Sequence, residues 1–246
     1  MNETPLDADI SFSAISPENA ARPSSVPLTV IVPTYNECRT LDEVARRLKK
    51  LPYVMEVLLV DDGSDDGSTE KVMQLASQPG VKALFHENNQ GKGACIRTAL
   101  EVAIGDFIVI QDADLEYDPA DIQLLLQPIL ENVADVVYGS RFLQGSLAEC
   151  LPMRRAMNRL LTWLSNRFTG LHLTDMETCY KVFRREVFAG MLLRESEFTA
   201  TIARGKWRIV EIPIAYNGRS HADGKKIGVR DGLRTLYCVV RYRWFD

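Results

Sequence analysis

Paired cysteines and long hydrophobic runs are the two features that this sequence lacks most clearly. Its five cysteines are scattered, odd in number and never spaced as C-x-x-C. That pattern indicates neither a disulfide framework nor a zinc site, and it favours a reducing, cytoplasmic environment. No uncharged apolar run approaches the roughly 18 residues of a membrane-spanning helix. We therefore expect a chain without disulfides and without a transmembrane segment.

The N-terminal stretch also lacks the features of a signal peptide. No lysine or arginine precedes Arg22, and there is no apolar core region. Residues 1–26 instead combine Pro, Ser, Asn and acidic residues, which predicts a disordered lead-in. We expect one folded domain over residues 27–246.

The composition is that of a globular protein, but its charge is unevenly distributed. The chain is 46% hydrophobic and 25% charged, with a net charge of −4. Residues 1–150 carry 11 basic and 24 acidic residues, whereas residues 151–246 carry 18 and 9. This asymmetry favours an acidic half that holds cations and a basic half that meets anions, although two solvated faces would give the same counts. No nucleic-acid partner is expected.

Strands and helices are predicted to alternate through the first 140 residues. A capping box, Thr40-x-x-Glu43, predicts the start of the first helix. Asp118 followed by Pro119 predicts the start of another, interrupted near Pro128. The apolar runs predict strands at 28–32, 57–60, 81–85, 107–110 and 134–138, and helices at 68–77 and 93–104. This order predicts an α/β fold with an open, mostly parallel sheet covered by helices on both faces.

Five segments of unusual residues follow the predicted strands. In an open α/β sheet, ligands bind beyond the carboxyl ends of the strands, so we expect one shared site. The segments are Pro33-Thr34-Tyr35-Asn36-Glu37, Asp61-Asp62, Asn88 to Gly93, Asp112-Ala113-Asp114 and Gly139-Ser140-Arg141.

The pair Asp112 and Asp114 is the strongest candidate for metal ligation. The two side chains point the same way in extended chain, and Ala113 between them takes little space. Two carboxylates so close are unfavourable unless a cation lies between them. An acidic turn that caps the next helix is the alternative, but Asp118-Pro119 fits that role better.

Two nearby motifs are weaker. Asp62 could accept hydrogen bonds from a base or ribose, or belong to a plain Asp-Gly turn. Gly91-Lys92-Gly93 fits neither a Walker motif nor a dinucleotide fingerprint, because Ile96 stands where glycine or alanine is needed. A tight turn at a helix start is its ordinary meaning, and a nucleotide-dependent dehydrogenase is disfavoured.

The basic half predicts two amphipathic helices. The first has an apolar stripe and four arginines, and the second closes the chain and is a candidate for docking on a membrane, although such a stripe also suits a core. The first stripe comprises Met157, Leu160, Leu161, Leu164 and Phe168, and the second Leu233, Leu236, Tyr237, Val240 and Trp244.

The strand-end motifs, taken together, resemble those of family 2 inverting glycosyltransferases with the GT-A fold. Within that family the chain is similar to polyprenyl-monophosphate sugar synthases of the dolichol-phosphate mannosyltransferase type. The closer similarity rests on Asp175-Met176-Glu177-Thr178-Cys179-Tyr180-Lys181 and on the loop from Gly218-Arg219 to Lys226-Ile227-Gly228. It covers about residues 28–243, with 27–145 as the nucleotide-sugar half and 146–246 as the acceptor half.

The resemblance implies a role for individual residues. Asp112, Asp114 and Glu116 would bind Mg²⁺ or Mn²⁺, with Glu116 where these synthases commonly carry Gln. Arg141 would act in catalysis and, with Arg155, engage the acceptor phosphate, although Arg155 also suits a solvated helix face. The nucleotide sugar would be held by Pro33, Tyr35, Glu37, Val60, Asp62, Ala113, Arg219 and Lys226.

The implied reaction is metal-dependent, inverting transfer of a hexose from GDP-mannose or UDP-glucose to a polyprenyl monophosphate. The enzyme would be cytoplasmic and bound peripherally at a membrane surface. The sequence departs from the family between Glu195 and Thr201, where an aromatic-Gly-aromatic-acidic segment is shortened, and at His221, where Tyr is frequent. The shortening leaves two alternatives: a catalytically weak nucleotide-sugar-binding scaffold, or a transferase with a soluble acceptor.

Overall fold

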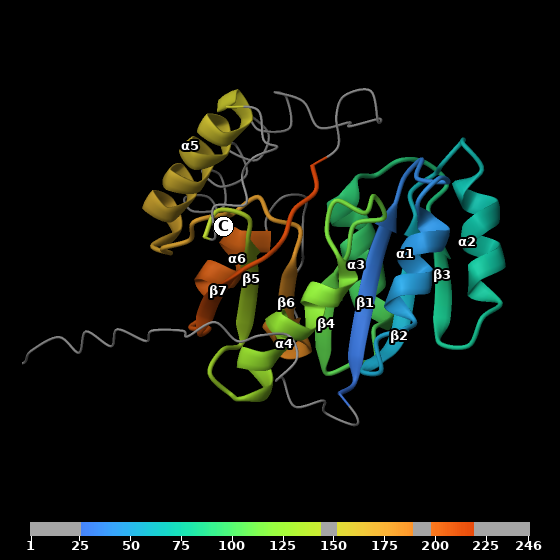
Figure 1. Ribbon diagram of the computed structural model, residues 1–246, viewed down its shortest axis with the longest axis horizontal. Coiled ribbons are helices and arrows are strands. Elements are labelled where there is room, and N and C mark those ends of the chain that lie inside the picture. Colours follow the sequence, from blue (N-terminus) through green and yellow to red (C-terminus); the bar gives the residue numbers. More distant parts are fainter. Residues whose placement is uncertain (1–25, 144–151, 189–197, 219–246) are drawn as a thin grey trace, which may run out of the picture.

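A computed structural model of the chain describes residues 26–143, 152–188 and 198–218, and its centre is a seven-stranded sheet (Figure 1). The strands are β1 Leu28–Thr34, β2 Val54–Asp61, β3 Val81–Phe85, β4 Phe107–Ile110, β5 Val136–Ser140, β6 Lys181–Arg184 and β7 Ile209–Pro213. The helices are α1 Leu41–Leu48, α2 Ser68–Ala76, α3 Lys92–Val102, α4 Ile122–Leu130, α5 Pro152–Thr169 and α6 Phe198–Arg204, with short 3₁₀ turns at Pro119–Asp121 and Arg185–Phe188.

The sheet confirms the predicted mostly parallel arrangement. Its strand order is β3-β2-β1-β4-β6-β5-β7, and the first four strands are parallel. Strand β6 is antiparallel to both β4 and β5, while β7 pairs with β5 in parallel. The carboxyl ends of β1, β2 and β4 therefore meet at one edge of the sheet.

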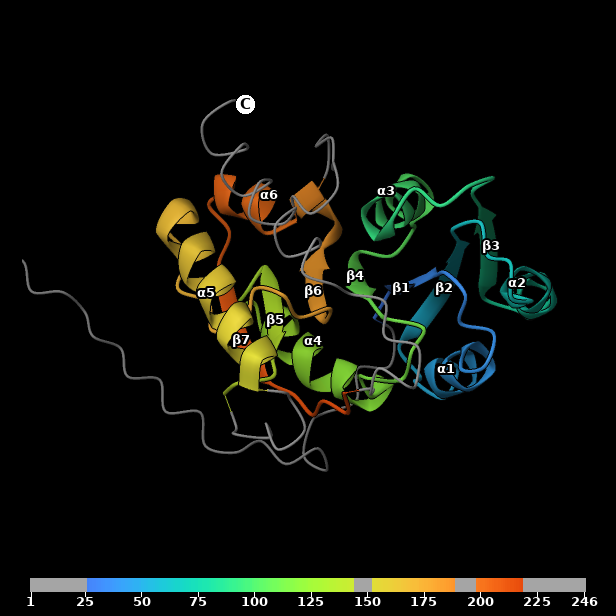
Figure 2. The ribbon, with the colours of Figure 1, turned by 90° about the horizontal axis from the view of Figure 1, so that it is seen from above.

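Helices cover both faces of the sheet, which explains the nearly continuous apolar strands. Helices α1 and α4 lie on one face, and α3 and α6 on the other (Figure 2). Residues Ile31, Leu58 and Ile108 on the central strands are fully buried. Strands with both faces covered are nearly continuous apolar runs, and β4 is wholly apolar. In β1 and β2 the buried polar residues Thr29 and Glu56 interrupt the run, and the Thr29 hydroxyl donates to the Glu56 carboxylate at 2.6 Å.

Two helix-boundary predictions are wrong in detail. Thr40 precedes α1 as its N-cap residue, but its side chain makes no capping hydrogen bond, and Glu43 pairs with Arg46 and Arg47 instead. Pro128 lies inside α4 and does not interrupt it. The prediction at Asp118 is confirmed, because its carboxylate accepts a hydrogen bond from the backbone N–H of Ala120.

The predicted apolar stripe of α5 is only partly buried. Leu161 packs into a small cluster with Met176 and Phe168, whereas Met157 and Leu160 are exposed. Beside Leu161, the buried residues of α5 include Thr162 and Ser165, which carry hydroxyl groups.

Within the described residues, no helix is long and apolar enough to cross a membrane. The predicted lead-in, except Val26, the loop after Gly218 and the closing helix lie outside the described residues.

Candidate functional site: a pocket at the carboxyl ends of the strands

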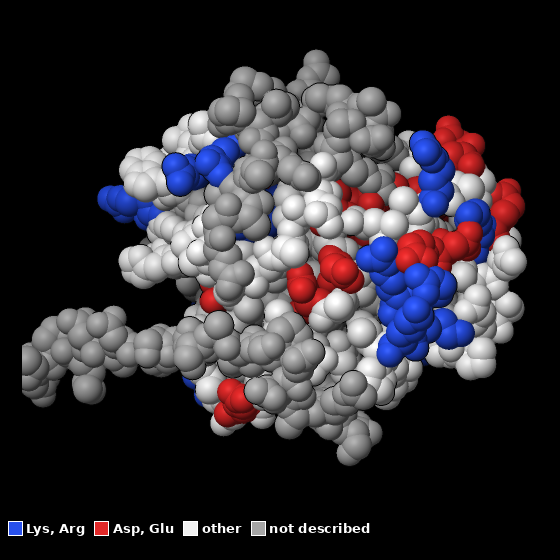
Figure 3. Space-filling view, in the orientation of Figure 1, with Lys and Arg blue, Asp and Glu red and all other residues white. Residues whose placement is uncertain are grey.

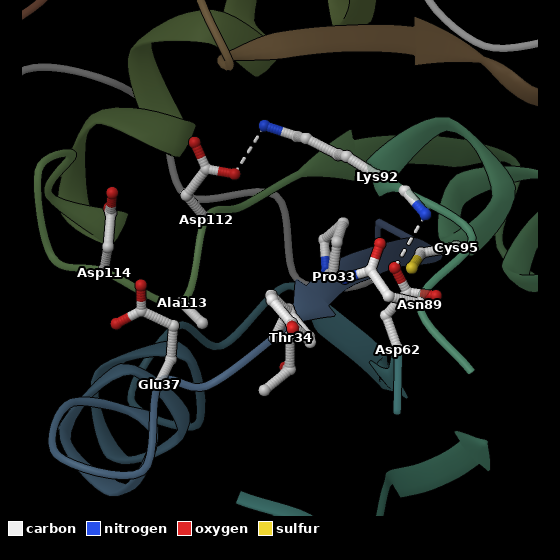
Figure 4. Close-up of a pocket in the computed structure, with 12 residues that line it drawn as sticks. Pro33, Thr34, Glu37, Asp62, Asn89, Lys92, Cys95, Asp112, Ala113 and Asp114 are labelled. Carbon is white, nitrogen blue, oxygen red and sulfur yellow. Dashed lines mark hydrogen bonds and ion pairs between the residues drawn. The ribbon is translucent and has the colours of Figure 1, made fainter. Parts of the chain in front are cut away.

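Four of the five predicted segments come together in one pocket at the carboxyl ends of β1, β2 and β4. Figure 4 shows their side chains around it. The lining residues are Pro33, Thr34, Tyr35, Glu37, Asp62, Asn89, Gly91, Lys92, Cys95, Asp112, Ala113 and Asp114. The fifth segment, which ends in Arg141, is not among the lining residues.

Hydrogen bonds hold the Asp112-Ala113-Asp114 turn in place. The backbone N–H of Gln111 donates to the Ile31 carbonyl at 2.9 Å, which fixes the turn to β1. The Thr40 hydroxyl donates to the Ala113 carbonyl at 2.6 Å, so this residue ties α1 to the turn instead of capping the helix. Asp114 Oδ1 accepts the backbone N–H of Glu116 at 3.0 Å. These bonds pre-position both carboxylates at the pocket.

Leu115, directly after the turn, adopts a backbone conformation that is rare for its residue type. Its φ is 62°, in the left-handed region that a residue with a branched side chain seldom enters. Such strain persists only where the surroundings impose it, and it gathers at functional sites.

Lys92 belongs to the predicted segment Asn88 to Gly93, but the sequence did not predict its contact with Asp112. It is the first residue of α3, and its ammonium donates to Asp112 Oδ1 at 2.5 Å and to Cys179 Sγ at 3.0 Å. Figure 4 shows the side chain reaching across the pocket to Asp112. The Asp112 carboxylate therefore has a cationic partner in this structure.

The Asp62 carboxylate is buried at the other end of the pocket and anchors the loop before α3. It accepts hydrogen bonds from the backbone N–H groups of Gln90 at 3.0 Å and Gly91 at 2.8 Å. His86 Nδ1 lies 2.7 Å from Asp62 Oδ1, and the Cys95 thiol is also nearby. Among the described residues, Asp62, His86 and Cys95 are the only three potential ligands whose atoms all lie within 4.8 Å of one another.

Glu116, the predicted third metal ligand, lies just beyond the pocket. Its Oε2 accepts a hydrogen bond from the Tyr216 hydroxyl at 2.8 Å, and its side chain is buried. Burial and the neighbouring Glu116 carboxylate raise the pKa of Tyr216, which keeps the phenol protonated as the donor. With the described residues in this arrangement, Asp112, Asp114 and Glu116 do not form a close cluster of three ligands.

Arg141 is held by the buried carboxylate of Asp175. Its Nε and Nη2 donate to the two oxygens of Asp175 at 2.7 and 2.8 Å, and its guanidinium lies 5.1 Å from the Tyr216 ring centroid. Burial alone would raise the pKa of Asp175, but the hydrogen bonds and charge of Arg141 lower it below its ordinary value. Asp175 takes two of the five N–H groups of the guanidinium.

Helix α5 contacts this pair through Asn158 and carries Arg155 on the same face. Asn158, one turn further along α5, donates to Asp175 Oδ1 at 3.1 Å. Residues three apart share a helix face, so Arg155 and Asn158 lie on the same side of α5. The Arg155 Nε is buried and has no hydrogen-bond partner among the described residues.

The other predicted residues divide into two groups. Val60 is fully buried within β2, in the core and away from the pocket lining. Arg219 and Lys226 lie outside the described residues.

The pocket brings the paired carboxylates of Asp112 and Asp114 together with the buried Asp62. Residues 29–192 match the family model for glycosyl transferase family 2. The chain belongs to this family. It is 29% identical to a dolichol-phosphate mannosyltransferase of Pyrococcus furiosus over 87% of this chain and 64% of the relative. An undecaprenyl-phosphate 4-deoxy-4-formamido-L-arabinose transferase of Pseudomonas fluorescens is 32% identical over 82% and 61%.

The chain thus spans somewhat less than two thirds of the length of these curated relatives. The chain covers a larger share of two solved structures with a similar fold. Mannosyl-3-phosphoglycerate synthase from Rubrobacter xylanophilus has a TM-score of 0.62 at 20% identity, covering 88% of this chain and 72% of that one.

A mannosyltransferase from Pyrobaculum calidifontis, solved with GDP-Man and Mn²⁺, has a TM-score of 0.56 at 18% identity and covers 89% and 70%. These likenesses confirm the predicted GT-A-type fold.

Proposed function

We propose that the chain catalyses inverting transfer of a hexose from a nucleotide sugar, GDP-mannose or UDP-glucose, to a polyprenyl monophosphate, with the help of a divalent cation. The observation that carries this proposal is the pocket that places Asp112 and Asp114 opposite the buried Asp62 end. The relatives named for transfer to dolichol phosphate and undecaprenyl phosphate support the acceptor class.

The donor would lie along the pocket. Pro33 and Asp62 lie at the end suited to the nucleoside, and Glu37 and Ala113 lie beside the Asp112–Asp114 end (Figure 4). Tyr35, which also lines the pocket, would contact the nucleoside. Asp62 would contact the nucleoside, and it also anchors the loop before α3. Val60 would act only by supporting Pro33, its partner in the sheet register.

The residues at the pocket fit Mg²⁺ or Mn²⁺. Carboxylate oxygens are the ligands these hard cations prefer, and the ammonium paired with Asp112 shows that positive charge is favoured there. Asp112 and Asp114 would hold the ion, with Glu116 contributing after it exchanges its bond to Tyr216. The cation would neutralise charge on the departing nucleoside diphosphate.

The remaining steps need positioning and cationic side chains, with no general base. A lipid phosphate is already an anion, so it must only be aligned with the anomeric carbon for in-line attack. Arg141, oriented by Asp175, and Arg155, with its buried Nε, would hold that phosphate. We propose that Arg219 and Lys226 close over the donor or acceptor phosphates.

The exposed face of α5 supports peripheral binding to a membrane surface. Trp163, Leu160 and Met157 are 62%, 50% and 42% exposed, and Arg159 and Arg167 are exposed beside them. Figure 3 shows basic and uncharged atoms over α5, whose sequence contains no acidic residue. Exposed tryptophan with arginine suits the headgroup region of an anionic bilayer.

The test is transfer of radiolabelled hexose from each donor to polyprenyl phosphate in detergent with Mn²⁺. The proposal predicts label that extracts into organic solvent and is lost in Asp114→Ala. Nucleotide binding without any product would favour the scaffold alternative, and label that stays in the aqueous phase with a soluble acceptor would favour the other alternative. Either result would contradict the proposal.

A further inference from the structure

Lys92 occupies the position at which a cation would meet Asp112. Its ammonium lies 2.5 Å from Asp112 Oδ1, and Lys92, Asp112 and Asp114 all line the same pocket (Figure 4). The side chain of Lys92 is 45% exposed. Within the described residues, the ammonium makes one further hydrogen bond, to Cys179 Sγ at 3.0 Å, and a thiol sulfur is a weak acceptor. The ammonium is therefore held mainly by the charge of Asp112.

An ammonium and a divalent cation compete for this carboxylate. Both need the same oxygen, and at such short range their like charges repel by an amount that increases as water is excluded. In the protein without donor, the Lys92–Asp112 pair therefore disfavours metal binding. A nucleoside diphosphate offers new oxygens to the ammonium, and the flexible stem of a lysine lets its charge move between partners.

We propose that Lys92 is an exchangeable counter-ion that makes metal binding depend on the donor. Without donor, Lys92 neutralises Asp112. When a nucleoside diphosphate enters, the ammonium moves to a phosphate oxygen, and Asp112 becomes available as a ligand. Metal and nucleotide then assist each other's binding, and this mutual effect is a coupling free energy between two sites. The inference rests on the proposed function, because it takes Asp112 as a metal ligand.

The experiment measures Mn²⁺ binding by the loss of the electron paramagnetic resonance signal of free Mn²⁺, without nucleotide and with UDP or GDP. The variants are Lys92→Gln, which removes the charge, and Lys92→Arg, which keeps it. Lys71→Gln is the matched control, because Lys71 pairs with Asp42 on the surface and does not line the pocket. Thermal unfolding checks that each variant is folded.

We expect Lys92→Gln to bind Mn²⁺ about tenfold more tightly than the parent without nucleotide, a factor that corresponds to the loss of one charge-assisted bond. The same variant should bind UDP or GDP about tenfold more weakly at saturating Mn²⁺. Lys92→Arg and Lys71→Gln should resemble the parent without nucleotide. Counter-ion exchange predicts opposite changes in the affinities for Mn²⁺ and for the nucleoside diphosphate. If Lys92 and Asp112 form only a static ion pair, the substitution would alter the unfolding temperature and neither affinity.

Two results would overturn the inference in distinguishable ways. If Mn²⁺ binds in the presence of nucleotide and is lost in Asp114→Asn, but Lys92→Gln leaves the nucleotide-free affinity unchanged, the exchange is wrong while the metal site stands. If folded parent protein binds no Mn²⁺ even with nucleotide, the metal-dependent function fails and the inference fails with it.

Discussion

The buried pair of Arg141 and Asp175 makes a quantitative prediction. Asp175 is fully buried, Arg141 is 14% exposed, and two parallel N–H···O bonds join them. Asp175→Ala leaves the guanidinium without its partner, and breaking a buried pair in this way costs about 3–5 kcal/mol of unfolding free energy. The loss of the Asn158 bond to the same carboxylate places the expected value in the upper part of that range.

Urea unfolding followed by tryptophan fluorescence measures this cost, provided that the m-value is unchanged. The double variant Arg141→Met with Asp175→Leu should recover most of the stability, because it leaves no buried charge. The double-mutant cycle that it forms with the single variants Arg141→Met and Asp175→Leu should give a coupling energy of at least about 2 kcal/mol. Because the Asp175 pKa is lowered in the folded state, its contribution is present above the ordinary carboxyl pKa and is lost as the pH falls through the lowered value. If Asp175→Ala lowers the free energy of unfolding by less than about 1 kcal/mol, as is typical of an exposed ion pair, Arg141 and Asp175 do not act as a buried, stabilising pair.

Three further predictions concern other parts of the fold. Asp135→Asn should lower the free energy of unfolding by about 1 kcal/mol at neutral pH, because Arg208, which is half exposed, lowers the Asp135 pKa to about 2. The difference from the parent should disappear as the pH falls from about 4 towards 2, and a difference that does not depend on pH would contradict this prediction. Gly105→Ala should lower the free energy of unfolding by about 2 kcal/mol or more, because a Cβ would lie 2.6 Å from the Pro27 carbonyl oxygen and 2.7 Å from the Thr29 nitrogen. Unchanged urea unfolding would contradict this close approach of the backbone to Gly105. Trp163→Ser should reduce sedimentation with anionic vesicles about fivefold or more while urea unfolding stays unchanged, whereas equal sedimentation would exclude α5 as the docking face.

The alternating strands, helices and strand-end motifs were predictable because their signals are local. Each strand is a short apolar run, and parallel order places the carboxyl ends together, so four of the five segments could be assigned to one site before the structure was known. The 3.6-residue period also predicted α5, but it could not tell which apolar side chains face solvent, and Leu160 proved exposed.

Long-range contacts were not predictable, because no local pattern specifies them. Strand β6 inserts antiparallel between β4 and β5, and the segment before it supplies Asp175 to Arg141 and Cys179 to Lys92. The Thr40-x-x-Glu43 pattern looked like a capping box, but tertiary structure directs the Thr40 hydroxyl to the Ala113 carbonyl. Gly91-Lys92-Gly93 looked like a tight turn, and only the fold reveals that Lys92 reaches Asp112.

The position of the bound cation tests the proposed function most directly. Crystals of the full chain grown with Mn²⁺ and a nucleoside diphosphate, measured near the manganese absorption edge, should give an anomalous peak between the carboxylates of Asp112 and Asp114. Asp114→Asn crystals under the same conditions should lose that peak. A manganese peak elsewhere in the molecule, with nucleotide bound in the pocket and these two carboxylates free of metal, would contradict the proposed function.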